Sequence, residues 1–91
     1  MLTLTIKKKW FDMILSGKKK EEYREIKPYY ISRFIKHIDR APFWVKFING
    51  YSRTSPVFTA LVQVKCGIGK IEWGAETNRE YFILSIIAIK E

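Results

Sequence analysis

Residues 15–30 read Leu-Ser-Gly-Lys-Lys-Lys-Glu-Glu-Tyr-Arg-Glu-Ile-Lys-Pro-Tyr-Tyr, a run of charged residues between two apolar stretches. Gly17 is a typical residue for ending a helix, and Pro28 is typical of the first turn of one. Between them we expect an extended strand from about Lys20 to Ile26. This segment therefore predicts the order helix, strand, helix in the first part of the chain.

The spacing of the charges also predicts which side chains meet. Alternate residues of a strand lie on the same face, so Lys20, Glu22 and Arg24 share one face. Lys19 stands at the turn before the strand, and its long flexible stem can bring the ammonium to that face. We expect Lys19, Glu22 and Arg24 to form a compact cluster. A solvated strand of alternating charges is the alternative reading of the same spacing.

Residue patterns on both sides predict the other elements. Helices are expected at Lys9–Ser16 and from Pro28 onward, the second with an apolar stripe of Ile31, Phe34, Ile35 and Ile38. Alternating or apolar runs predict strands at residues 2–6, 43–48, 57–66 and 81–89, the last of them buried on both faces. In residues 57–66 the buried side would include Cys66, with a bulge at Gly67 or Gly69. Strands and helices in this order indicate an α+β fold with a mixed or antiparallel sheet.

Length and composition set further bounds. Ninety-one residues with 47% hydrophobic content suit one domain, residues 1–91, with a packed core. No stretch is long and apolar enough to predict a membrane span or a secretory signal, so we expect a soluble, cytoplasmic protein with no membrane partner. A single Cys and a single His predict no metal site. The segment Gly67-Ile68-Gly69-Lys70 lacks the spacing of a phosphate-binding loop, so we expect no cofactor.

The charge is strongly positive and uneven. The net charge is +8, and residues 1–40 contain eleven Lys or Arg against five Asp or Glu. An excess of positive charge in one region is typical of proteins that bind polyanions. Nucleic acid is favoured over a membrane surface, because the sequence has no basic amphipathic helix of useful length.

Four residues within the segment 15–30 resemble a family motif. Gly17, Lys19, Glu22 and Arg24 match the G-x-K-x-x-E-x-R signature of the ASCH domain, a small module of the PUA-like superfamily. Small single-domain members also resemble this chain in residues 4–14 and 49–51 and in Trp73-Gly74-Ala75. The resemblance implies a PUA-like curled β-barrel of about five or six strands with two short helices. Closure of the barrel would also hide the apolar strand edges.

The resemblance implies that the chain binds RNA or a nucleotide. The expected site is a basic, aromatic-rimmed cleft around the motif, in which Lys and Arg neutralise phosphate and rings stack on bases. The candidate ligand-binding residues are Lys19, Lys20, Glu22, Arg24, Tyr29, Tyr30, Asn49, Tyr51, Arg53, Glu72 and Trp73.

Hydrolysis is the alternative function that the resemblance implies. Some small ASCH proteins remove acetyl from N4-acetylcytidine, and others are assigned ribonuclease activity. Lys19, Glu22 and Arg24 are then the catalytic candidates, but Glu22 stands where the amidohydrolases carry a threonine proposed as nucleophile. A carboxylate beside a lysine can instead activate water, and Glu72 or Glu76 are candidates for a further acidic group. A third possibility is that the cluster only neutralises itself at the mouth of the barrel.

Overall fold

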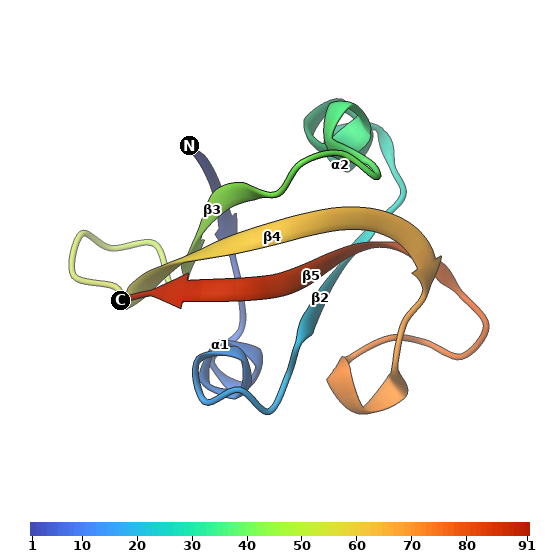
Figure 1. Ribbon diagram of the computed structural model, residues 1–91. Helices are drawn as coiled ribbons and strands as arrows, with labels where there is room; N and C mark the ends of the chain where they lie inside the picture. The colour runs from blue at the N-terminus through green and yellow to red at the C-terminus, as the bar shows by residue number, and fades with distance from the viewer.

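A single curled sheet of five strands forms the centre of the protein (Figure 1). The computed structural model describes all 91 residues. The strands are β1 (Leu2–Thr5), β2 (Glu21–Glu25), β3 (Phe43–Ile48), β4 (Val57–Ile68) and β5 (Glu80–Lys90). They are ordered β1-β3-β4-β5-β2, and only the β1–β3 pair is parallel. The predicted α+β class and curled sheet are confirmed.

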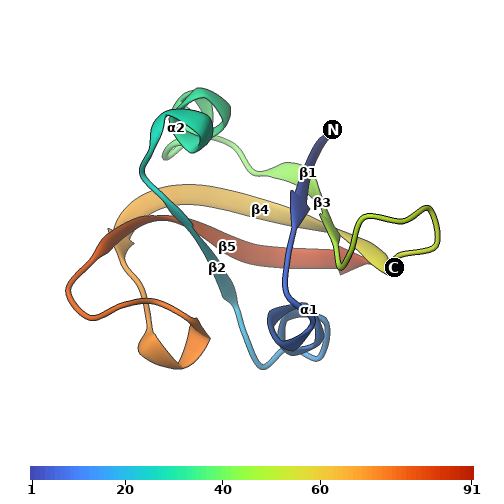
Figure 2. The same ribbon diagram turned by 180° about the vertical axis from the view of Figure 1, so that it is seen from behind.

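The sheet is a half-barrel that does not close through its backbone. Its edge strands, β1 and β2, lie on the same side of the molecule without a hydrogen-bonded ladder between them (Figure 2). We call this gap the seam. The helix α1 (Lys8–Leu15) lies at one end of the half-barrel and α2 (Pro28–Phe34) at the other. The predicted concealment of strand edges by barrel closure is therefore incomplete.

Helix α1 forms where the sequence predicts a helix, but it begins and ends one residue earlier than expected. Phe11 and Ile14, one turn apart, are buried against the sheet, and Gly17 ends the turn after the helix with a left-handed backbone (φ 84°). Glycine adopts that conformation without the steric cost that a Cβ brings. No helix in the structure is both long and apolar enough to cross a bilayer.

Helix α2 begins at Pro28 as expected, but of its predicted apolar stripe only Phe34 and Ile38 pack against the core. The helix ends at Phe34 and continues as a short 3-10 helix, η1 (Ile35–His37), so the helical period does not extend to Ile38. Phe34 is fully buried and stacks on Tyr30, one turn earlier, whereas Ile31 and Ile35 are exposed. Tyr30 therefore packs on the buried face of the helix, where the predicted stripe had placed isoleucine side chains.

The long hairpin of β4 and β5 supplies one side of the core. Phe58, Ala60, Val62 and Val64 are all buried, as their alternation predicts. Cys66, expected on the same side, is exposed, because the chain after α2 covers this face only as far as a bridge at Val64. The bulge also lies elsewhere, between Leu61 and Val62.

Strand β5 is buried on both faces only in its first half. Residues 81–84 are all buried, whereas Ile87 is exposed. Tyr23 and the segment before β5 cover this first half: the ring centroids of Tyr23 and Tyr81 lie 5.7 Å apart, and the amide of Glu76 donates to the hydroxyl of Tyr81. The prediction of a strand covered throughout is wrong for its second half.

Candidate functional site

The three motif side chains meet in a buried ionic cluster. One carboxylate oxygen of Glu22, Oε1, lies 3.3 Å from Nζ of Lys19. The other, Oε2, accepts hydrogen bonds from Nε (3.1 Å) and Nη2 (2.7 Å) of Arg24. The side chains of Lys19 and Glu22 are only 1% and 8% exposed. The cluster predicted from the strand period therefore forms, and it does not lie flat in solvent.

Lys19 is held in place by a hydrogen bond from its backbone amide and by aromatic rings around its ammonium group. Its amide donates to the carbonyl of Met13, which fixes the turn between α1 and β2. Its ammonium donates to the carbonyl of Trp73 and lies 4.4 Å from the ring centroid of Trp10 and 5.1 Å from that of Tyr23. Burial lowers the pKa of Lys19, and the charge of Glu22 opposes that effect.

Arg24 links the two edges of the sheet across the seam. From β2 its Nη2 donates to the carbonyl of Thr5 in β1 at 2.9 Å, and its Nη1 donates to the hydroxyl of Tyr30 in α2 at 3.1 Å. Burial acts to lower the pKa of Arg24, but the charge of Glu22 and the hydrogen bonds to Tyr30 and Glu22 together raise it. The four hydrogen bonds of this guanidinium occupy four of its five N–H groups. Arg24 thus connects strands that the backbone leaves apart.

Two adjoining hollows open along the seam, and we call them together the seam cleft. The larger, about 570 Å³, follows the edge of β1 from Thr3 to Lys7 and is flanked by Tyr29 and Tyr51. The second, about 420 Å³, is lined by Lys7, Lys27 and Arg79 among others. Thr5, Ile6, Lys7, Arg24 and Tyr30 line both hollows, so the two are adjacent.

The seam cleft brings together basic side chains, some with and some without an ion-pair partner, and aromatic side chains that differ in exposure. Lys7 and Lys27 form no ion pair, whereas Arg79 is paired with Glu25 and Glu76. Tyr51 is 92% exposed and Tyr29 51% exposed. The cleft thus offers two free ammonium groups and two accessible rings.

Eight of the predicted site residues lie in or beside the cleft. Arg24, Tyr29, Tyr30, Asn49 and Tyr51 line its larger hollow. Glu22 lines the second hollow. Lys19, Glu22 and Trp73 line a further small hollow of about 90 Å³ between Trp10 and Gly74. The amide of Asn49 is used within the fold, where it donates to the carbonyl of Ile6 at 2.9 Å.

The other three predicted residues lie elsewhere. Lys20 precedes the first residue of β2, and it lines a separate apolar hollow with Ile14 and Ile86. Arg53 is exposed in the loop between β3 and β4 and lines none of the hollows. Glu72 is exposed on the 3-10 helix η2 (Ile71–Trp73) and also lines none. The structure does not bring these three residues into the seam cleft, although Lys20 shares its hollow with Lys19.

The prediction omitted Lys7, Lys27 and Arg79. Lys7 follows β1, Lys27 precedes α2, and Arg79 precedes β5, so all three stand at element ends rather than in the motif. Their meeting depends on β1 and β2 being the two sheet edges, for which the sequence carries no local signal. Glu76, proposed by position alone, does line the cleft.

Comparisons with protein-family models, with curated proteins and with solved structures find no match to this chain. The fold and the cleft define a class in structural terms: a small α+β half-barrel whose open seam is bridged by a buried Lys–Glu–Arg cluster. Its function is therefore inferred from the geometry and charge of the seam.

Proposed function

We propose that the seam cleft binds single-stranded RNA or a nucleotide. The observation that carries this proposal is the exposure of Tyr29 and Tyr51 in a hollow that also contains the unpaired Lys7. Stacking of a base on an aromatic side chain contributes about 1–3 kcal/mol and is open to any base. Unpaired bases present both faces for such stacking, which favours a single strand over a duplex.

Phosphate binding is assigned to Lys7 and Lys27 rather than to the motif. Both line the cleft, and neither is neutralised by a carboxylate. Arg24 has one N–H group left, and the ammonium of Lys19 is enclosed by Glu22 and the carbonyl of Trp73. The motif cations therefore shape the cleft, and the two free lysines meet the ligand. The net charge of +8 supports attraction of a polyanion.

The exposed thiol of Cys66 is compatible with a reducing compartment, and we place the protein in the cytoplasm.

Replacement of Tyr51 tests the proposal. Because its ring is almost wholly exposed, Tyr51→Ala should leave the free energy of unfolding nearly unchanged but weaken binding by roughly 1–3 kcal/mol. Tyr51→Trp keeps a stacking surface and is the matched control. Fluorescence anisotropy with a labelled single-stranded RNA octamer at low salt measures the affinity of each variant. Equal affinity for the wild type and Tyr51→Ala, or no binding by the wild type, would reject the proposal.

A hydrolase acting on N4-acetylcytidine or RNA is the second candidate. The lowered pKa of Lys19, beside Glu22 in the small hollow, favours it, because catalytic lysines are commonly tuned by burial. Against it, both oxygens of Glu22 already contact cations, so a water molecule would have to compete with Lys19 and Arg24 for the carboxylate. Product analysis after incubation with each substrate decides the matter. Turnover that a folded Lys19→Met variant loses would establish hydrolysis, and no turnover by the wild type would exclude these two reactions.

A further inference from the structure

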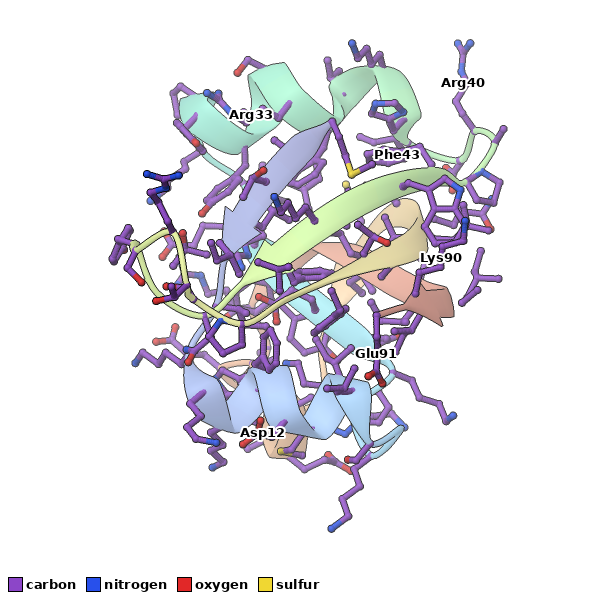
Figure 3. All side chains as sticks on the ribbon, turned by 90° about the vertical axis from the view of Figure 1, so that its left-hand side faces the viewer. Asp12, Arg33, Arg40, Phe43, Lys90 and Glu91 are labelled. Carbon is purple, nitrogen blue, oxygen red and sulfur yellow. The ribbon has the colours of Figure 1, made fainter.

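A third hollow lies beside α2, outside the cleft described above. It measures about 360 Å³ and is bounded by the start of β1, by α2 with η1, and by the start of β3. Its polar wall consists of Arg33, Lys36 and His37, and its aromatic wall of Phe43 and Trp44. No Asp or Glu lines it. We call it the α2 hollow. Figure 3 shows Arg33 on α2 and Phe43 on the same side of the molecule, away from Asp12 on α1.

The α2 hollow adjoins the larger hollow of the seam cleft. Tyr29 lines the seam cleft, and the guanidinium carbon of Arg33 lies 3.5 Å from the centroid of the Tyr29 ring. Along β1, Leu2 lines the α2 hollow and the next residue, Thr3, lines the seam cleft. One stacked pair of side chains thus connects the two hollows.

Hydrogen bonds hold Arg33 in place, but two of its nitrogens keep N–H groups without a partner. Arg24, in contrast, has only one N–H group left. Its Nη1 donates to the carbonyl of Tyr29 at 2.8 Å and to the hydroxyl of Ser32 at 3.0 Å. Its Nε and Nη2 make no hydrogen bond, and no carboxylate pairs with Arg33 or with Lys36. An arginine with free donors on two nitrogens suits the oxygens of a phosphate group.

Next to the two cations, His37 and Phe43 form a stacked pair of rings. The His37 ring stacks on Phe43 with centroids 3.6 Å apart and planes 11° from parallel. Burial, and then the charge of Lys36, lower the pKa of His37, so the ring is mainly neutral near pH 7. A neutral ring pair next to free cations has the same mixture of groups as the seam cleft.

We propose that the α2 hollow is a second subsite for the same single-stranded RNA, so that the natural ligand is an oligonucleotide rather than one nucleotide. This inference rests on the proposed function of the seam cleft. A mononucleotide can occupy only one of the two hollows. A longer strand with a nucleotide stacked at Tyr29 and Tyr51 continues past Arg33, whose free donors and the ammonium of Lys36 hold a following phosphate.

The test compares oligonucleotide lengths in matched variants. Arg33→Gln/Lys36→Gln removes the two cations of the α2 hollow, whereas Lys18→Gln/Lys65→Gln removes two exposed cations that line none of the hollows. Anisotropy with labelled oligouridylates of 2 and 8 nucleotides is recorded over a range of salt concentrations. We expect the first variant to bind the octamer at least tenfold more weakly than the wild type and the dimer almost unchanged. Its salt slope for the octamer should become shallower by about 0.7 for each phosphate that the variant no longer neutralises.

The possible outcomes distinguish failure of the second subsite from failure of the proposed function of the seam cleft. If the first variant loses no more octamer affinity than the control variant, or loses dimer and octamer affinity equally, the second subsite is rejected and the seam cleft stands. If the wild type binds neither oligonucleotide at low salt, the proposed function is rejected together with the subsite.

Discussion

Glu22 is the residue on which the ionic cluster depends, because it alone separates two buried cations. With it in place, Lys19 and Arg24 each contact one of its carboxylate oxygens. Removing one partner from a buried ion pair commonly costs about 3–5 kcal/mol, because the remaining charge is left without compensation. The same arrangement limits the access of water to Glu22, since both oxygens already contact a cation.

Glu22→Gln should therefore destabilise the fold, by about 3–5 kcal/mol near pH 7. The variant also loses the charge that opposes the effect of burial, so the pKa of Lys19 should fall further below 10.5. Between that lowered pKa and 10.5 the unfolded state binds more protons than the folded state, so the free energy of unfolding should rise with pH in this range.

Urea denaturation at several pH values measures both effects, with the exposed Glu72→Gln as the matched control. A Glu22→Gln variant as stable as the control would show that the cluster does not support the fold.

Some of the site could be predicted residue by residue, and the reasons are local. Glu22 and Arg24 share a face because they are two apart in a strand, which the run of charge and its flanking Gly17 and Pro28 already indicate. Lys20 departs from this pattern because the strand starts one residue later. The role of Arg24 in bridging to Thr5 depends on a strand far away in the fold, which local spacing does not specify.

At the scale of elements, the segment between β4 and β5 carries Trp73 to the ionic cluster. This segment can approach β2 only because residue 69 is glycine: a Cβ there would lie 2.7 Å from Cζ of Tyr23 and 2.8 Å from Cβ of Ala75. The amide of Lys70 then donates to the hydroxyl of Tyr23 at 2.9 Å. Gly69 belongs to the segment Gly67-Ile68-Gly69-Lys70, which lacks the spacing of a phosphate-binding loop. Its role in the structure is to allow close packing against β2.

Gly69→Ala should destabilise the protein by about 1–3 kcal/mol, the usual cost of an overpacked site. Gly67→Ala is the matched control, because its Cβ would meet only the flexible end of Ile83 at 3.2 Å, and we expect a change below about 1 kcal/mol. Urea denaturation of the two variants gives the comparison. Equal decreases in stability would contradict the close approach of Gly69 to Tyr23.

Helix α2 shows why an apolar period alone is an incomplete guide to packing. The pattern of Ile31, Phe34 and Ile35 assumes a helix that continues, but the helix ends at Phe34 and the chain tightens into η1. The buried face then includes Tyr30, whose ring stacks on Phe34 while its hydroxyl meets Arg24. A tyrosine can fill this position because it has an apolar body and a polar tip.

For the whole molecule, the order of strand and helix patterns was sufficient to predict an α+β fold, whereas the curl of the sheet was expected only from the family resemblance. The order of the strands was not predictable, since pairing joins segments far apart in the chain. The position of the seam follows from that order, and so does the meeting of Lys7 with Lys27. The basic and aromatic character of the site could be predicted, whereas the particular cations at its surface could not.

The central claim is that the open seam of the half-barrel binds a single-stranded nucleic acid, and an NMR titration tests it most directly. Octauridylate is added to the ¹⁵N-labelled protein at low salt, and changes in the amide resonances are mapped onto the fold. We predict changes concentrated at residues 3–7, 27–33 and 49–51, which shrink as salt is added because salt weakens the binding of lysine and arginine to phosphate. An unchanged spectrum, or changes centred on the exposed half of β5 around Ile87, would contradict the claim.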